Sequence, residues 1–311
     1  MIRYIDVYRA SLQGHRDANE DVEKVIVNMY YGDGVNENYR ADKTPADIFI
    51  ICDGHGGSSV AEYVASELEK YLTNVRIRYP LNVDYVKKLY TSIQKKIVNH
   101  PERIGQLTGS TALVVIRYVY QNSLWIQVIN LGDCRAVISK SGIAVPLTQD
   151  HKPHWPDEKR RIDKVNENRL PRDREKVKFN EGDWRIKDLS VSRSFGDLDN
   201  YPYVTHVPEV YNYLLTNQDK FIVIACDGVW DVLENHEVIN FVSDHLMGNH
   251  IELYDIPLLY DHRQHPPNMS IAKKLAKYTI ARGSRDNVSV IIIDLYASQS
   301  KKNENVFKHF E

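Results

Sequence analysis

Three apolar segments of this chain end in the same way, with an aspartate next to a glycine. Each segment is short and rich in β-branched and other apolar residues, as is typical of buried strands. The three junctions are Cys52-Asp53-Gly54, Leu131-Gly132-Asp133 and Cys226-Asp227-Gly228. A fourth aspartate, Asp286, comes directly before another apolar segment, residues 287–295. The chain is therefore expected to fold around several strands whose ends carry carboxylates.

The order of the predicted elements favours one fold class. We expect strands over the apolar runs at residues 47–52, 110–118, 124–131, 220–226 and 287–295. Apolar residues at i, i+4 spacing predict a helix over residues 60–72, capped by Ser58 or Ser59, and another over residues 86–97. A third helix is expected to begin at the N-cap Ser270. Pairs of strands followed by helices indicate an α+β fold, with antiparallel sheets and helices packed on them.

Composition and charge limit the classes of function. The chain has 311 residues, of which 42% are hydrophobic and 26% charged, the balance of a folded globular protein. The formal net charge is −2, so no overall basic field attracts nucleic acid or an anionic membrane, and neither is expected as a partner. No apolar run approaches the about 20 residues that span a bilayer, and the N-terminus lacks the pattern of a signal peptide. We expect the protein to be a monomer. We expect it in the cytoplasm, with the nucleus as the alternative location.

The three cysteines, Cys52, Cys134 and Cys226, are widely spaced and form no Cys-x-x-Cys pair. Reduced thiols are the expected state. Cys52 and Cys226 each precede an aspartate at a predicted strand end. Because side chains alternate along a strand, we expect both sulfurs to point away from the aspartates and into the packed interior.

Two polar stretches interrupt the regular pattern. Residues 151–185 are rich in charged side chains with little apolar periodicity, and are interpreted as an exposed flap. Residues 245–269 contain three prolines and are interpreted as an inserted loop. Their four histidines, His245, His250, His262 and His265, fit a solvated loop better than a zinc site. Residues 297–311 form a polar C-terminal tail.

Carboxylates at the ends of neighbouring strands would meet at one edge of the core, where cations must offset their repulsion. Because oxygen ligands dominate and no cysteines and histidines have the spacing of a zinc site, Mg²⁺ or Mn²⁺ is the preferred ion. Two such ions about 3.5–4 Å apart can share a water and lower its pKa. Any single Asp-Gly pair is equally well explained as a turn after a strand. Four aspartates in such positions favour a metal centre.

A charged segment near the N-terminus adds candidates to this centre. It runs from Gly14 to Asp21 and includes Arg16 and Glu20. By itself it is better explained as an exposed charged turn. Beside the strand-end aspartates, Glu20 becomes a candidate metal ligand and Arg16 a candidate clamp for a phosphoryl group.

Seven short motifs, in this order along the chain, resemble those of the type 2C metal-dependent protein phosphatases. They are Arg16-x-x-x-Glu20-Asp21, Asp53-Gly54-His55-Gly56-Gly57, Gly109-Ser110-Thr111-Ala112, Gly132-Asp133-Cys134-Arg135, Ser192-Arg193-Ser194-Phe195-Gly196-Asp197, Asp227-Gly228-Val229-Trp230-Asp231 and Ser284-Arg285-Asp286-Asn287. The resemblance extends from Gly14 to Leu295. No one motif is decisive, whereas seven in order are highly specific.

The resemblance implies a single catalytic domain over residues 1–296 with a four-layer α/β/β/α architecture. Two packed antiparallel sheets would be flanked by helices, with two Mg²⁺ or Mn²⁺ ions at one end of the sandwich. Asp53 would bridge the two ions, Glu20 and the Gly54 carbonyl would complete one site, and Asp227 with Asp286 would hold the other.

The resemblance also assigns residues around these ligands. Asp21 would contact the metal ligands and not the ions themselves. Asp133, with Asp227 and Asp231, resembles the weaker third cation site of some members.

The implied reaction is hydrolysis of phosphoserine and phosphothreonine in phosphorylated proteins. Hydroxide activated by the two-ion centre would attack phosphorus in line, without a phosphoenzyme. Arg16 would bind the phosphoryl oxygens, and His55 would protonate the departing oxygen as general acid.

Three other functions are possible for such a chain. A thiol-based phosphatase needs an arginine six positions after its cysteine, and no cysteine of this chain has one. A catalytically inactive phosphatase-like binding module would have lost metal ligands, whereas all the candidate ligands are present. A phosphodiesterase or a phosphatase of small molecules is the third alternative, and phosphopeptides tested beside simple esters would distinguish it.

The sequence departs from the family mainly in the flap. Where many members have a glycine pair, this chain has Val165-Asn166-Glu167-Asn168, and residues 171–184 are unusually charged. These departures leave the metal chemistry intact. They concern the choice of substrate, because mixed charges beside a cleft can select the sequence around a phosphosite.

Overall fold

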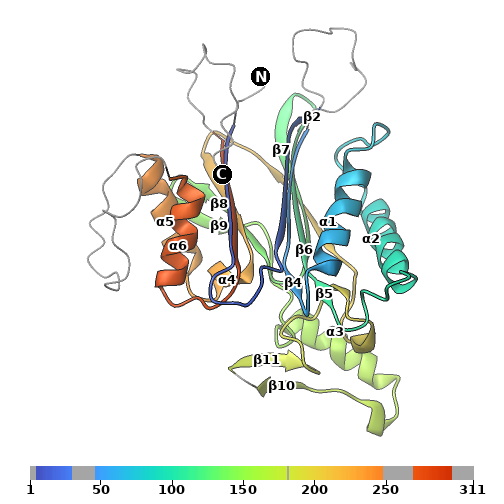
Figure 1. Cartoon of the computed structure of the whole chain (residues 1–311). Coiled ribbons are helices and arrows are strands. Elements are labelled where there is room, and N and C mark those ends of the chain that lie inside the picture. Colours follow the sequence, from blue (N-terminus) through green and yellow to red (C-terminus); the bar gives the residue numbers. More distant parts are fainter. Residues whose placement is uncertain (1–4, 30–45, 181, 248–268, 296–311) are drawn as a thin grey trace.

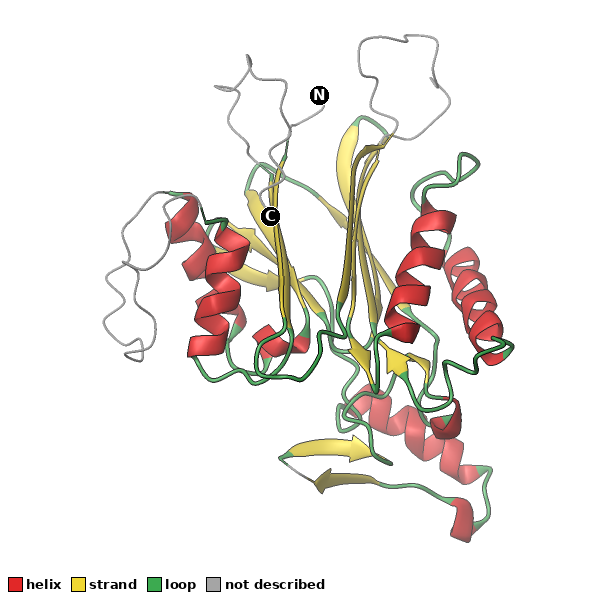
Figure 2. Cartoon of the chain, viewed as in Figure 1, coloured by secondary structure: helices red, strands yellow, loops and turns green. Residues whose placement is uncertain are grey.

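The apolar strands pair into two five-stranded antiparallel sheets that pack face to face (Figure 1). The strand order is β1-β15-β14-β8-β9 in the first sheet and β13-β7-β6-β3-β2 in the second. The computed structural model describes residues 5–29, 46–180, 182–247 and 269–295. Figure 2 shows helices on the outer face of each sheet. The predicted α+β, four-layer sandwich is therefore confirmed.

Neighbouring strands within each sheet are antiparallel throughout. The strands of the first sheet are β1 (Asp6–Leu12), β15 (Val288–Asp294), β14 (Asp219–Ala225), β8 (Arg135–Lys140) and β9 (Ile143–Pro146). The strands of the second sheet are β13 (Glu209–Leu214), β7 (Ser123–Leu131), β6 (Ala112–Tyr120), β3 (Ala46–Cys52) and β2 (Val22–Met29).

The central strands are buried on both faces, which explains why they read as continuous apolar runs. In β3, Ile48 and Ile50 pack toward the helices outside the sheet, whereas Phe49 and Ile51 pack between the two sheets. All four side chains are fully buried. Burying each such side chain stabilises the fold by about 1.5–3 kcal/mol relative to leaving it exposed.

Helices cover the two outer faces. On the second sheet lie α1 (Ser59–Leu72) and α2 (Val83–Val98), as predicted from the apolar spacing. On the first sheet lie α4 (Asp227–Trp230), α5 (Asn235–Leu246) and α6 (Ile271–Ala281). The outer layers thus bury the outer faces of both sheets.

Ser58 and Ser270 both stand at the N-cap positions of their helices, as predicted, and only Ser270 makes a cap hydrogen bond. The Ser270 hydroxyl accepts a hydrogen bond of 3.2 Å from the amide of Lys273 at the start of α6. Ser58 makes no cap hydrogen bond, because its own backbone is already helical and its hydroxyl instead donates to Glu62 at 2.7 Å.

The flap contains more regular structure than its sequence pattern indicated. It comprises α3 (Pro156–Glu167), the 3₁₀ turn η1 (Pro171–Asp173) and the hairpin of β10 (Val177–Asn180) and β11 (Asp183–Ile186). The helix was hard to find because it buries only Glu158 and Ile162, so its apolar periodicity is weak. Ile162 packs in a small cluster with Ile186 and Tyr203.

Short elements complete the described part of the chain. They are the three-stranded sheet of β12 (Phe195–Gly196), β5 (Gly109–Ser110) and β4 (Gly54–His55), and the 3₁₀ turn η2 (Leu198–Asn200). Within the described residues, no helix has the length and apolar character needed to cross a membrane. Most of the predicted insertion, residues 248–268, and the predicted tail, residues 297–311, lie outside the described residues.

Candidate metal centre

Aspartates from both sheets meet at one end of the sandwich. Asp53 directly follows β3, and Asp227 begins α4 just after β14. In Figure 1, α4 and β4 lie at the same end of the two sheets. Because β15 is antiparallel to β14, Asp286, which precedes β15, lies at this end as well. The topology thus gathers carboxylates that are far apart in the sequence.

The proximity of these carboxylates changes their acidity. Burial raises the pKa of Asp53 well above its ordinary value, and neighbouring carboxylates raise it further. These neighbours are Asp227, Asp21, Asp133 and Asp286. Burial also raises the pKa of Asp227, and the largest contribution from a neighbouring charge comes from Asp133. Carboxylates this close can all be ionised only when a cation offsets their repulsion.

Asp21 is enclosed within the same group. Burial raises the pKa of Asp21 to about 6, and both of its carboxylate oxygens are buried without a hydrogen-bond partner of good geometry. One ligand atom from each of Asp21, Asp53 and Cys226 lies within 4.8 Å of the other two. Buried polar oxygens normally have partners, so this group is suited to a cation.

The position of Cys226 differs from the sequence expectation. Its sulfur lies beside carboxylates and does not point away from them. The reason is that β14 ends at Ala225 and Cys226 is the N-cap of α4, so strand alternation no longer applies. Cys52 is still within β3 and points into the core under α1, as expected. Cys134 is buried, with its sulfur 3.2 Å from the Thr111 hydroxyl.

Backbone contacts hold the candidate ligands in place. The Asp53 amide donates to the Thr111 hydroxyl at 3.0 Å, and the Thr111 amide donates to the Asp53 carbonyl at 2.9 Å. A Cβ added to Gly54 would lie 2.5 Å from the Glu20 carbonyl oxygen, so only glycine permits this close approach. The segment bearing Glu20 therefore packs directly against the turn after β3.

Asn287 joins the N-terminal segment to the start of β15. Its side-chain oxygen accepts from the Glu20 amide at 2.9 Å. Its side-chain nitrogen donates to the carbonyls of Gln13 and Ala18 at 2.8 and 2.9 Å. Asn287 belongs to a motif visible in the sequence, but its role was not predicted, because its three partners lie at the other end of the chain.

Arg16 lies at the solvent side of the centre. Its guanidinium donates to the Asp286 carboxylate at 2.7 Å, and its side chain is 58% exposed. The predicted phosphate clamp is therefore next to the carboxylates and accessible from solution.

His55 is paired with Asp197, which was named in a motif but was not among the predicted site residues. Its Nε2 lies 2.8 and 2.9 Å from the two carboxylate oxygens of Asp197, which is itself buried. Burial alone would lower the pKa of His55, but the hydrogen bond and charge of Asp197 outweigh burial and raise the pKa. A Cβ on Gly109 would lie 2.4 Å from Nε2 of His55, so this pair requires glycine at position 109. The only available sequence signal for Asp197 was its place at the end of a family motif.

The three candidates for a third cation site are in different surroundings. Asp133 is almost completely buried, and its carboxylate accepts a hydrogen bond of 2.5 Å from the ammonium group of Lys152. Asp227 lies in the carboxylate group described above. Asp231 follows α4 and is exposed.

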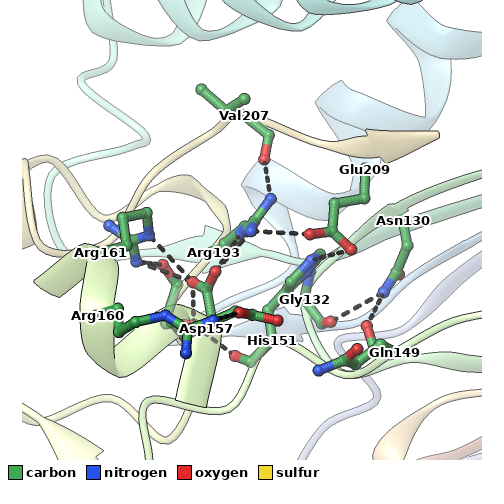
Figure 3. Close-up of polar contacts among 12 residues, drawn as sticks. Asn130, Gly132, Gln149, His151, Asp157, Arg160, Arg161, Arg193, Val207 and Glu209 are labelled. Carbon is green, nitrogen blue, oxygen red and sulfur yellow. Dashed lines mark hydrogen bonds and ion pairs between the residues drawn. The ribbon is translucent and has the colours of Figure 1, made fainter. Parts of the chain in front are cut away.

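A largely buried network of charged side chains joins the flap to the sheets (Figure 3). Arg193 donates to the Val207 carbonyl at 3.0 Å and to the Glu209 carboxylate at 3.1 Å. It also donates to Glu158 of α3 at 2.5 Å. Arg161 of the same helix donates to Glu158 at 2.9 Å. The network therefore holds α3 against β13, which begins at Glu209.

The donor set fits hard divalent cations. The candidates offer carboxylate and carbonyl oxygens, which suit Mg²⁺ and Mn²⁺. The unpartnered oxygens of Asp21 and the raised pKa of Asp53 are the features expected of a centre that holds cations.

Comparison with known proteins gives consistent results. The chain matches the family model described as Protein phosphatase 2C over residues 6–288. It is 66% identical over 168 residues to the PP2C-like domain-containing protein R307 of Acanthamoeba polyphaga mimivirus. The matched region covers 54% of this chain and 93% of that protein. The chain is 32% identical over 307 residues to Protein phosphatase 1L of Bos taurus, which covers 94% of this chain and 73% of that protein.

Other relatives are longer, and the fold recurs in solved structures. The chain spans 38% of a protein kinase and PP2C-like domain-containing protein of Oryza sativa, to which it is 30% identical over 293 residues, or 91% of this chain. A crystal structure of a phosphatase from Toxoplasma gondii has a TM-score of 0.69 and 21% identity, covering 94% of this chain and 93% of that one. At this identity the likeness concerns the fold.

Proposed function

The chain belongs to the protein phosphatase 2C family and is a phosphoprotein phosphatase, and we propose that it hydrolyses phosphoserine and phosphothreonine at a centre of two Mg²⁺ or Mn²⁺ ions. One observation carries the proposal for this chain. Asp53, Asp227 and Asp286 come from three separate strand ends, yet the charges of Asp227 and Asp286 raise the pKa of Asp53. Beside Asp53, both carboxylate oxygens of Asp21 are buried without a hydrogen-bond partner. Such a group of carboxylates is costly unless cations bind to it.

The proposed ligands follow from this arrangement. Asp53, Glu20, the Gly54 carbonyl, Asp227 and Asp286 would hold the two ions. Asn287 supports this assignment because it fixes the backbone of Glu20 beside the residue that follows Asp286. Two ions bound there would lower the pKa of a water, so that it can attack phosphorus.

The remaining residues would act on the substrate. The exposed guanidinium of Arg16 would bind the phosphoryl oxygens and the charge that develops on them. His55 would protonate the departing seryl or threonyl oxygen. Because Asp197 engages Nε2 of His55, this proton would come from Nδ1.

We further propose that residues 1–296 form one catalytic domain that acts in the cytoplasm on phosphorylated proteins. The free state of all three cysteines supports this location.

The test is hydrolysis of a phosphothreonine peptide with and without Mn²⁺ or Mg²⁺. The intact chain is compared with Asp53→Asn and Asp227→Asn, and with Asp163→Asn as a matched control. Asp163 is an exposed residue of α3 that pairs with Lys159 at 2.9 Å, away from the centre. Circular dichroism of each variant establishes that it is folded.

Metal-dependent turnover that is lost in Asp53→Asn and Asp227→Asn and retained in Asp163→Asn is the expected result. Turnover that survives both substitutions would place the active site elsewhere. A folded chain without turnover under any metal would support the inactive binding module. A phosphorylated protein intermediate trapped during turnover and detected by mass spectrometry would exclude direct hydrolysis.

A further inference from the structure

A lysine from the flap lies within the acidic centre. Nζ of Lys152 is 2.5 Å from Oδ2 of Asp133 and 3.9 Å from Oδ2 of Asp183, which begins β11 of the flap hairpin. The Lys152 side chain is 11% exposed and that of Asp133 only 1%. A lysine is seldom buried to this degree unless it is paired, so the contact with Asp133 is the reason for its position.

The backbone holds Lys152 at this position. The residue before it, His151, donates its amide to the Gly132 carbonyl at 2.9 Å, and its ring nitrogen Nδ1 accepts from the Gly132 amide at 3.0 Å. Figure 3 shows His151 and Gly132 side by side. The segment is thus bonded along the turn that carries Asp133, and the lysine ammonium is placed opposite the aspartate.

The charge of Lys152 acts on more than one carboxylate. Burial would lower the pKa of Lys152, but the charges of Asp133, Asp227 and Asp231 outweigh burial and raise it, so the group is a permanent cation. The positive charge in turn opposes the rise in the pKa of Asp227 and Asp231. At Asp133 the protein thus supplies its own counterion, whereas the carboxylate oxygens of Asp21 have no hydrogen-bond partner.

We propose that the ammonium group of Lys152 is the resident counterion of Asp133, and that a divalent cation binds at Asp133 only by displacing it. Oδ2 of Asp133 already binds the ammonium, and a cation bound at the other oxygen of this buried carboxylate would lie within a few ångström of that positive charge and be repelled by it. Displacement would also remove the contact of Lys152 with Asp183. The flap hairpin would therefore respond when a cation binds at Asp133. This inference rests on the proposed cation centre. It makes Lys152 a positioning residue that sets the cation affinity of the site at Asp133, the weakest site of that centre.

The first test measures Mn²⁺ binding directly, by titration calorimetry and by electron paramagnetic resonance of free Mn²⁺, without substrate. The proteins are the intact chain, Lys152→Met, Lys152→Arg and the control Lys159→Met, whose lysine lies on the surface of α3. Removing the competing charge of Lys152 should increase the Mn²⁺ affinity of the weakest site by at least about tenfold. The interaction energy of two charges in close contact is larger than the energy that corresponds to a tenfold change in affinity. Lys152→Arg and Lys159→Met should bind as the intact chain does. The gain should disappear in the double variant Lys152→Met with Asp133→Asn.

A second test uses the intact chain and does not depend on the folding of a variant. Lysines are acetylated with acetic anhydride at increasing Mn²⁺ concentration, and the extent at each lysine is read by mass spectrometry. Acetylation of Lys152 should rise over the range in which the weakest site fills, while that of Lys159 stays constant.

An unchanged weakest site in Lys152→Met, or Lys152 acetylation that does not rise as Mn²⁺ binds, would overturn the inference. Failure of the proposed function is distinguishable from this, because then no Mn²⁺ binds to the intact chain or none of it supports turnover.

Discussion

The guanidinium of Arg16 donates a hydrogen bond of 2.7 Å to the carboxylate of Asp286. Arg16 follows β1 and Asp286 precedes β15, and these two strands are antiparallel neighbours, with Leu12 opposite Val288. The pairing of the first and last described strands therefore places the proposed phosphate clamp on a proposed metal ligand. Cation binding to Asp286 would weaken this ion pair and free Arg16 for the substrate.

For Arg16 we predict a loss of catalytic activity that replacement by lysine does not restore. Arg16→Ala and Arg16→Lys should both lower kcat/KM for a phosphothreonine peptide by about 10–100-fold, because a hydrogen bond to a charged group contributes about 1.5–3 kcal/mol and lysine lacks the bidentate geometry. Steady-state kinetics at saturating Mn²⁺ measure this. Arg160→Lys, at an exposed arginine of α3, is the control. A Lys variant as active as the intact chain would argue against bidentate binding.

For His55 and Asp197 we predict an effect that depends on the leaving group. His55→Ala and Asp197→Asn should lower kcat for a phosphothreonine peptide by about 10²–10⁴-fold, the usual contribution of a general acid. For p-nitrophenyl phosphate the loss should be small, because p-nitrophenolate leaves without protonation. Rates of each variant on both substrates give the comparison. Equal losses on the two substrates would assign the pair a structural role.

For Asn287 we predict a loss of stability and of metal affinity together. Asn287→Ala removes the hydrogen bonds to the Glu20 amide and to the carbonyls of Gln13 and Ala18. The unfolding free energy should fall by about 2–4 kcal/mol, since each buried group left without a partner costs about 1–3 kcal/mol. Urea unfolding measures the first effect and Mn²⁺ titration the second. Asn168→Ala, at an exposed site after α3, should change neither.

For Glu158 we predict a pH-dependent contribution to stability. Burial would raise the pKa of Glu158, but Arg193 and Arg161 outweigh burial and hold it at about 2, below the ordinary 4.5. The unfolded state therefore binds a proton more readily. The stabilisation is complete above about pH 4.5 and is lost as pH falls toward 2, with a total on the order of 3 kcal/mol.

Urea unfolding of the intact chain and of Glu158→Gln between pH 6 and pH 3 tests this contribution. The variant should be less stable at pH 6, and the difference should narrow as pH falls. Glu167→Gln, at an exposed position of the same helix, should show no such difference. A gap that stays constant with pH would mean that the carboxylate charge of Glu158 does not stabilise the fold.

Much of the fold could be predicted because the central strands are buried on both faces. Residues 47–52 and 124–131 read as uninterrupted apolar runs, and they form β3 and β7. The edge strands β1, β2, β9 and β13 were missed, since they are only partly buried and have mixed sequences. The inner strand β8 was missed as well, because its buried part is short and both of its ends are charged. The helix α3 was missed for the same reason, because only Glu158 and Ile162 are buried in it.

Within the candidate centre, residues next to a glycine at a strand end could be predicted, and their partners could not. Asp53 and Asp227 carry a local pattern that is visible in the sequence. Asp197 lies 142 positions from His55, and nothing in either segment indicates that the two are in contact. Such pairs depend on which loops become neighbours after the sheets have formed.

The sequence by itself determined the main strands and helices and the oxygen-rich chemistry of the centre, because these depend on residue type and on short-range order. Seven motifs in order also indicated the family, and the two-sheet fold was expected from that resemblance. Only the tertiary structure decided that Lys152 is paired with Asp133, that Arg16 is paired with Asp286 and that the sulfur of Cys226 lies beside Asp21. The reason is geometric: side-chain direction at the end of a strand is set by how the chain leaves the sheet and by what packs against it, and both are properties of the assembled fold.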